Sequence, residues 1–476
     1  PDPCDEHCPE DFKAQARELL PRVQAGPGPQ DMDLRQALLK FIGDFANWDN
    51  SSHAGYLAVG RGLVQAAHPE ETPLVVDPFA GGGSIPLEAL RLGCEAFASD
   101  LNPVACLILK VMLEDISRHG PELAEELRRV GGEIKKQAEK ELAEFYPKDE
   151  DGATPIAYLW ARTVRCESPN CGAEIPLMRS FWLCKKPNRK KALQLKVVKA
   201  EGTPPSVEFE IFEPKSDRDV RGGTVTRARA TCPCCNTVLP PERVRAQLSS
   251  QRGGADVIFD NDGKRVGGAR MLAVVTLYQG IQGRHYRLPT EQDYEAVWKA
   301  KKRLSAILDE WERGGRKGLC PVPDESLPPI GTLGFRVQRY GMLQWGDLFT
   351  VRQKMAITTL IRALPTGDTA AFRPLLAFAV SKQSDFNSSL SRWANHMEKS
   401  VATFGRQALP ILWDWGEVVP TSNASGAFDV AVDWIANAAA TIQEMCQLKG
   451  QVQIADACES PLPDETSGLW FTDPPY

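Results

Sequence analysis

Apolar residues recur every three or four positions in several stretches of this chain, and that spacing predicts amphipathic helices. Near the N-terminus the pattern covers residues 12–24 and 34–46, so residues 1–70 are expected to be mostly helical. Further helical stretches are expected at 107–144, where the sequence is highly charged, and at 291–313 and 352–384. Residues 257–288 instead suggest short strands. The chain therefore mixes helices and strands.

A different pattern follows the N-terminal helical region. The apolar run Leu-Val-Val-Asp at 74–77 predicts a buried parallel strand, and the three glycines at 81–83 predict a tight turn. Glycines let a backbone pass close to a ligand, and Ser84 is expected to cap the helix that follows. A second strand at 95–99 ends in Asp100, about 20 positions past the turn, where an acid can accept hydrogen bonds from ribose hydroxyls.

A nicotinamide dinucleotide is one cofactor that binds to a glycine turn of this kind. A nicotinamide dinucleotide site normally carries three glycines spaced as GxGxxG. Here Gly83 is followed by Ser84, Ile85 and Pro86, so the third glycine is missing and a dehydrogenase is disfavoured.

The last four residues, Asp473-Pro474-Pro475-Tyr476, suit a flat base that bears an exocyclic amine. The lone pair of such an amine is delocalised into the ring, so a site must draw electron density back to nitrogen before it can attack a methyl group. Asp473 and a prolyl carbonyl can accept hydrogen bonds from the amine, and the two prolines remove competing N–H donors. Tyr476 would stack on the base. A Pro-Pro pair alone can also simply end a strand.

Together, Asp77-Pro-Phe-Ala-Gly-Gly-Gly-Ser, Asp100-Leu-Asn-Pro and Asp473-Pro-Pro-Tyr resemble the S-adenosylmethionine-dependent DNA adenine-N6 methyltransferases. The resemblance implies a Rossmann-like α/β fold with S-adenosylmethionine as cofactor. It assigns catalysis to Asp473, Pro474, Pro475 and Tyr476. It assigns cofactor binding to Asp77, Phe79, Ala80, Gly81, Gly82, Gly83, Asp100, Asn102, Asp456 and Ala457.

Within that assignment, Phe79 and the glycines would surround the methionine part of the cofactor, and Asp77 would lie near its amino group. Asp100 would bind the ribose. Residues 452–457 read as a strand that ends at Asp456, which in the family faces the cofactor's adenine. An aspartate at a strand end is equally often a turn residue.

Cysteine spacing predicts a metal site elsewhere in the chain. Cys166 and Cys171 form one knuckle, and Cys232 and Cys235 form a second about sixty residues later. Two such knuckles indicate a four-thiolate structural zinc site, with Cys234 pointing away. The alternative is a set of scattered reduced cysteines. The segment between the knuckles contains a lysine-rich stretch that we expect to be too polar to build its own core, so its order should depend on the metal.

The knuckles and their flanking residues sharpen the resemblance. With Ala161-Arg-Thr-Val-Arg165 and the segment at 175–182, the chain is similar to adenine-specific DNA methylases that contain a zinc ribbon. Some members accompany phage-defence clusters such as DISARM. The resemblance thus implies a double-stranded DNA substrate, a phage-defence or restriction-modification setting and defence-system protein partners.

Asp100 and Asp473 are too far apart for one strand-helix step, so a large insertion is expected between the second and third core strands. A methyltransferase sheet also needs strands after its catalytic loop, so we expect the chain to be part of a longer protein. The expected organisation is a helical region at 1–70, a first core part with the cofactor motif at 71–125, a helical connector at 126–153, a zinc-ribbon insertion at 154–246, a mixed and helical insertion that is a candidate for target recognition at 247–400, and a second core part at 401–476.

Composition fits a large globular protein, with 42% hydrophobic and 25% charged residues among 476. No run of eighteen apolar residues and no signal peptide are present, so we expect no membrane association and a cytoplasmic location. The formal net charge is −6, so binding to a polyanion would need a local basic patch. The candidate patch is Lys185, Lys186, Arg189, Lys190 and Lys191, and the alternative is a solvated loop.

The sequence therefore favours an enzyme that methylates adenine N6 in DNA, with the target base flipped out of the duplex and stacked on Tyr476. Methylation of cytosine N4, or of a base in RNA, uses the same amine chemistry and stays open. A third alternative is a DNA-binding subunit that keeps the methyltransferase fold as a scaffold without catalysis.

Overall fold

The computed structural model describes residues 1–446, 448–467 and 469–474, and the chain forms two compact units. The first unit combines Pro1–Glu126 with Ala436–Tyr476, and the second comprises Leu127–Ile435. The two ends of the sequence therefore fold together, and the long middle segment folds separately from them. Among the described residues, no helix is both long enough and apolar enough to cross a membrane.

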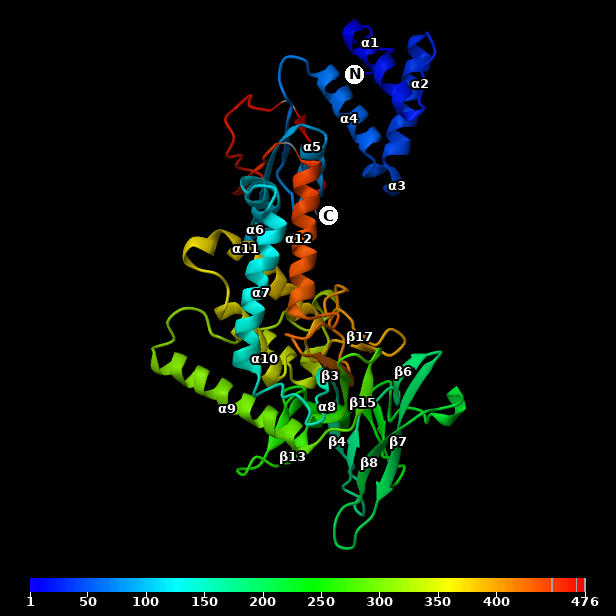
Figure 1. Ribbon diagram of the computed structural model, residues 1–476, viewed down its shortest axis with the longest axis vertical. Coiled ribbons are helices and arrows are strands. Elements are labelled where there is room, and N and C mark those ends of the chain that lie inside the picture. Colours follow the sequence, from blue (N-terminus) through cyan, green and yellow to red (C-terminus); the bar gives the residue numbers. More distant parts are fainter. Residues whose placement is uncertain (447, 468, 475–476) are drawn as a thin grey trace. The chain divides into compact units, whose positions relative to one another are not determined.

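The first unit begins with a small helical bundle (Figure 1). Its buried side chains repeat at helical spacing and form one apolar cluster around Phe12, Leu20, Leu34 and Phe41. The helices expected within residues 1–70 are thus present. They are α1 (Glu10–Leu19), α2 (Asp31–Phe45), α3 (Trp48–Ser51) and α4 (Ala54–Ala67).

A four-stranded parallel sheet follows, in the order β19-β2-β1-β20. Its strands are β1 (Leu74–Asp77), β2 (Glu95–Asp100), β19 (Gln451–Ile454) and β20 (Leu469–Trp470). Strand β1 spans the residues predicted from the apolar run, and β2 extends one residue past its prediction. If the four strands are numbered by their order in the chain, their order across the sheet is 3-2-1-4. The direction of winding therefore reverses between β1 and β20. In parallel α/β sheets, ligands bind at the carboxyl ends of the strands at such a reversal.

The long insertion lies where it was expected, between the second and third strands of this sheet. Helices α5 (Ser84–Arg91) and α6 (Pro103–Leu109) accompany the sheet. The charged stretch at 107–144 contains one long helix, α7 (Leu123–Leu142), and the chain returns to the sheet through α12 (Phe428–Met445). Leu90, Ala98, Leu109 and Leu113 are among the buried residues that form the core beside the sheet.

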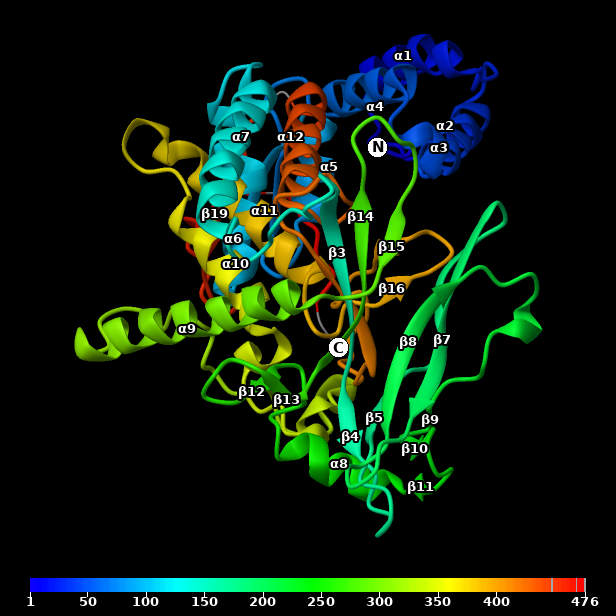
Figure 2. The same cartoon turned by 60° about the horizontal axis from the view of Figure 1, so that its bottom comes forward.

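Two antiparallel sheets form the centre of the second unit (Figure 2). One has the order β15-β14-β3-β18, and the other has the order β6-β7-β8. Their facing side chains form a shared apolar core that includes Leu159, Phe181, Leu193 and Phe209. The strands are β3 (Thr154–Ala161), β14 (Arg270–Leu277), β15 (His285–Arg287), β18 (Asp414–Val418), β6 (Trp182–Lys186), β7 (Arg189–Val198) and β8 (Ser206–Phe212).

The segment between the cysteine knuckles corrects one expectation, because its lysine-rich stretch does contribute to a core. Strands β7 and β8 pair antiparallel, with Leu193 opposite Ile211 and Leu195 opposite Phe209. Along β8, Val207 and Phe209 are buried while Glu208 between them is exposed. Alternation therefore places the polar side chains on one face and leaves an apolar face to pack against the larger sheet.

Further helices and short strands complete the second unit. Helix α9 (Glu291–Arg313) covers the residues predicted from its apolar spacing. The helix expected at 352–384 is two helices, α10 (Val351–Arg362) and α11 (Arg373–Phe386), because Pro365 and Gly367 interrupt it. The shorter elements are β4 (Thr163–Arg165), β5 (Glu174–Pro176), β9 (Val225–Thr226), β10 (Arg229–Thr231), β11 (Val238–Leu239), α8 (Pro241–Ser249), β12 (Val257–Phe259), β13 (Arg265–Gly268), β16 (Trp393–Ala394) and β17 (Lys399–Ser400).

Candidate functional site

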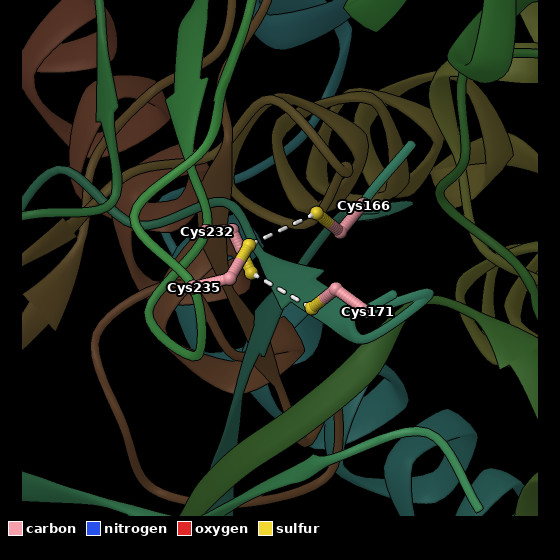
Figure 3. A group of neighbouring side chains, drawn as sticks. All are labelled: Cys166, Cys171, Cys232 and Cys235. Carbon is pink, nitrogen blue, oxygen red and sulfur yellow. Dashed lines mark hydrogen bonds between the residues drawn. The ribbon is translucent and has the colours of Figure 1, made fainter. Parts of the chain in front are cut away.

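The four cysteines chosen from their spacing meet in the second unit. Figure 3 shows their sulfur atoms pointing toward one another. The Sγ atoms of Cys166 and Cys235 are 3.5 Å apart, those of Cys171 and Cys232 are 3.7 Å apart, and all four lie within 4.8 Å of one another. Two short hairpins make this convergence possible, because Cys166 follows β4 and Cys232 follows β10.

This arrangement could hold a metal ion. A tetrahedral zinc ion with Zn–S bonds of about 2.3 Å places neighbouring sulfur atoms about 3.8 Å apart, close to the two distances observed. Three of the four cysteines are buried. A hydrogen bond with Thr237 lowers the pKa of the exposed one, Cys235, to about 6, which favours the thiolate form that binds metal. Four thiolates leave no coordination position for water, so such a metal would be structural.

Replacing Cys232 with serine is expected to reduce zinc from about one ion per chain to a small fraction of that, because three thiolates and a hydroxyl bind zinc poorly. The matched control is Cys234→Ser, since Cys234 lies beside the cluster without belonging to it. Elemental analysis of both variants measures this. Because β6, β7 and β8 pack in the apolar core that they share with the larger sheet, hydrogen exchange should increase around 163–177 and 225–239 and change little in those strands. Metal loss from Cys234→Ser with retention in Cys232→Ser would contradict the assignment.

The glycine turn after β1 is fastened to β2 by backbone hydrogen bonds. The amide of Ala80 donates to the carbonyl of Ser99 at 3.1 Å. The amide of Gly81 donates to Oδ2 of Asp100 at 2.9 Å, and the amide of Asn102 donates to the other oxygen, Oδ1, at 2.8 Å. Asp100 therefore orders the turn itself, a role that the sequence did not suggest. Each carboxylate oxygen can accept a second hydrogen bond, so Asp100 keeps acceptor capacity for a ligand.

The three glycines differ in what they require. Gly83 has φ +82°, a left-handed conformation in which any residue with a Cβ would be strained. A Cβ at Gly82 would meet no atom within 4 Å, so this part of the turn is open. Helix α5 starts at Ser84 with Gly83 as its capping residue, and no side chain caps it. The expectation that Ser84 caps the helix is therefore wrong, because the left-handed glycine makes the turn.

An aspartate stands at the carboxyl end of each strand of the parallel sheet. Asp77 ends β1, Asp100 ends β2, Asp456 lies two residues past β19, and Asp473 lies three residues past β20. The amide of Phe471 donates to the carbonyl of Val76 at 3.1 Å, which holds the start of the last loop against β1. The carboxyl ends of parallel strands share one edge, so the four acids are brought to that edge from positions far apart in the sequence.

Asp100 and Asp473 lie near enough to Asp77 to affect its pKa. Its side chain is 2% exposed, and burial raises its pKa. Hydrogen bonds with Thr472 and with the amide of Phe79 act in the opposite direction, while the negative charges of Asp100 and Asp473 raise the pKa further. Asp77, Asp100 and Asp473 therefore interact electrostatically, although they come from three different motifs.

The other assigned residues at this edge have varied surroundings. Phe79 is 40% exposed, so an aromatic face is available beside the turn. The side chain of Asn102 accepts from the amide of Val104 at 3.0 Å and caps α6. Asp456 is exposed and accepts from the amide of Cys458 at 2.9 Å, which is the geometry of a turn residue. Ala457 beside it is partly buried, Pro474 is exposed, and Pro475 and Tyr476 lie outside the described residues.

Acidic partners surround most of the basic run proposed for nucleic acid. Lys186 and Arg189 both pair with Glu398, whose side chain is fully buried, and Lys186 lies 3.0 Å from it. Lys185 lies 3.4 Å from Asp217, and Lys191 lies 2.6 Å from Glu213. Much of the positive charge is therefore neutralised within the second unit, and Lys190 is the member of the run with no carboxylate partner among the described residues.

A buried ion pair in the second unit was not predicted from the sequence. Arg352 and Glu417 are 1% and 0% exposed, and two guanidinium nitrogens lie 2.8 and 3.1 Å from the carboxylate oxygens. Tyr146 and Trp160 also donate to Glu417, at 3.1 and 2.8 Å. The guanidinium lies 3.9 Å from the centre of the Tyr158 ring. An arginine on α10 and a glutamate on β18 have no sequence signature that would pair them.

No protein-family model matches the chain, and no curated protein or solved structure matches it either. The chemistry of the two sites therefore carries the functional argument.

Proposed function

We propose that this chain is an S-adenosylmethionine-dependent methyltransferase that acts on adenine N6 in DNA. The observation that carries the proposal is the meeting of three motifs at one edge of the parallel sheet. The glycine turn after β1, Asp100 after β2 and the Asp473 loop after β20 flank the reversal of winding between β1 and β20. A Rossmann-like methyltransferase fold with an inserted zinc-binding unit accounts for this strand order.

The residues at this edge fit the proposed cofactor. The turn is open at Gly82, Phe79 offers an exposed aromatic face, and Asp100 keeps acceptor capacity for ribose hydroxyls. S-adenosylmethionine would supply an electrophilic methyl group when bound. Asp77 and Asp100 supply negative charge beside the turn, which suits a ligand that carries a positively charged sulfonium and an amino group.

Asp473 is the residue expected to bind the target amine. Its carboxylate is exposed, so it can accept a hydrogen bond from an exocyclic N–H group. Accepting that hydrogen bond orients the amine and increases electron density on nitrogen, and the carboxylate can receive the proton that the methylated amine releases. Positioning of two reactants in this way can contribute roughly 7 to 11 kcal/mol.

Replacing Asp100 with alanine is expected to weaken the binding of S-adenosylmethionine by roughly 1.5 to 3 kcal/mol, the range for hydrogen bonds to a charged group. The loss has two causes, since Asp100 would bind the ribose and also holds the amide of Gly81. Asp100→Asn serves as the comparison, because its amide oxygen can keep one of the two backbone hydrogen bonds. Calorimetric titration measures both variants, and an unchanged dissociation constant in Asp100→Ala would remove this residue from the cofactor site.

The proposal is tested by incubating the protein with methyl-tritiated S-adenosylmethionine and one of three substrates: duplex DNA, single-stranded DNA or RNA. Label is expected in duplex DNA, and removal of adenine from the duplex should prevent it. Label in RNA alone, or in DNA without adenine, would replace the proposal with the RNA or cytosine-N4 alternative. A protein that binds DNA and transfers no label would be a binding subunit with a methyltransferase scaffold.

A further inference from the structure

A cavity of about 240 Å³ lies in the second unit, at one end of the two packed sheets. Its lining combines aromatic rings with charged and amide groups, and the residues that matter for its chemistry are Arg179, Trp182, Arg392, Trp393, Asn395 and Asp414. Small-molecule sites usually occupy about 300 to 1,000 Å³, so this cavity has room for a single ring system and is too small for a whole cofactor.

Asp414 is the carboxylate in the lining of this cavity. It is partly buried, and Oδ1 accepts a long hydrogen bond of 3.3 Å from the amide of Arg179. Burial raises the pKa of Asp414, and the nearby charges of Arg179 and Arg392 oppose that shift. Among the described residues neither arginine forms an ion pair with the carboxylate, so Asp414 keeps hydrogen-bond acceptor capacity.

The charges of the lining restrict the ligand. An anion placed against Asp414 would be repelled, and a cation would be repelled by Arg179 and Arg392, which are both exposed at this cavity. A neutral planar group fits better if it has N–H donors on one edge and acceptors on another. Trp182 and Trp393 give the cavity apolar walls, although Lys185 lies 4.6 Å over the ring of Trp182.

Guanine has this distribution of groups. Its N1–H and N2 amino group are adjacent donors that match the two oxygens of a carboxylate. Its O6 and N7 are adjacent acceptors that arginine recognises with two hydrogen bonds. Adenine and cytosine each offer a carboxylate one donor beside a ring acceptor, so Asp414 would bind them less well.

We propose that this cavity binds one unpaired guanine of the nucleic acid on which the protein acts, with Asp414 reading its Watson–Crick edge. The inference rests on the proposed action on nucleic acid and names a base that the second unit recognises. Enzymes that extrude bases read them through such hydrogen bonds combined with apolar packing.

The test measures the affinity of the whole protein for a ten-residue oligothymidylate that carries one central guanine. For comparison, the central guanine is replaced with adenine or with hypoxanthine. Hypoxanthine lacks the N2 amino group of guanine. We expect guanine to bind at least about tenfold more tightly than either, as a hydrogen bond to a charged group allows. Asp414→Asn should lose this preference, because the NH2 group of asparagine would face an N–H donor of guanine in place of a carboxylate oxygen. Asp309→Asn, which removes an exposed acid from α9, should keep it.

Equal affinity for the three oligonucleotides, or an Asp414→Asn variant that is folded by circular dichroism and keeps the preference, would overturn the inference. Neither S-adenosylmethionine nor methyl transfer enters this measurement. A protein that methylates adenine without preferring guanine therefore contradicts only the guanine site. A protein that prefers guanine and transfers no methyl group contradicts only the proposed methyltransferase activity.

Discussion

Replacing Asp473 with alanine is expected to lower the rate of methyl transfer by roughly 10²- to 10⁴-fold, the usual contribution of a positioned acid or base. Asp473 is exposed and belongs to none of the buried clusters described here, so the variant should fold normally. Cofactor affinity should change little, because the turn is held by Asp77 and Asp100. Calorimetry gives the affinity, and a single-turnover methylation assay gives the rate.

Asp464→Ala is the matched control for that variant, because Asp464 is an exposed acid nine residues earlier in the same segment. The control should methylate at the wild-type rate. Full turnover in Asp473→Ala would exclude this residue from the chemistry. Equal losses of cofactor affinity and of rate would instead make Asp473 part of the cofactor site.

Replacing Glu417 with glutamine is expected to destabilise the second unit by about 3 to 5 kcal/mol, since removing one partner leaves the Arg352 charge buried and uncompensated. Urea unfolding followed by tryptophan fluorescence suits this measurement, because Trp160 hydrogen-bonds to Glu417 and its ring lies 6.2 Å from that of Trp415.

Two comparisons make the stability result specific. Glu312→Gln breaks an exposed pair between Glu312 of α9 and Arg316, three residues past the end of that helix, and should cost less than about 1 kcal/mol. The double variant Arg352→Met, Glu417→Leu should be more stable than Glu417→Gln, because it removes both buried charges. If Glu417→Gln costs no more than Glu312→Gln, the buried pair does not stabilise this unit.

The features that the sequence predicted depend on local signals. The strand at 74–77 and the helix at 291–313 follow from continuous and periodic apolar residues, and the glycine turn follows from Gly81 and Gly83, whose φ angles are positive. The four cysteines were found because two hairpins impose a fixed spacing on metal ligands. In each case a short stretch of chain contains most of the information.

The features that the sequence did not predict depend on contacts between distant segments. Strand β3 pairs with β14 and with β18, which lie more than a hundred residues away in the chain. The acidic partners of Lys186 and Lys191 could not be known before β6 and β7 were placed. The sequence alone therefore did not show that carboxylates pair with this basic run. Likewise, the hydrogen bond between Asp100 and the turn depends on the pairing of β1 with β2. The sequence did not show this contact, so Asp100 was assigned to ligand binding alone.

The most direct test of the central claim is to identify the modified nucleoside. Duplex DNA is incubated with the protein and S-adenosylmethionine, digested to nucleosides and analysed by mass spectrometry, with Asp473→Ala in parallel. The account predicts N6-methyladenine in the wild-type reaction and a much smaller amount with the variant. N4-methylcytosine as the product, or equal N6-methyladenine from the wild type and the variant, would contradict it.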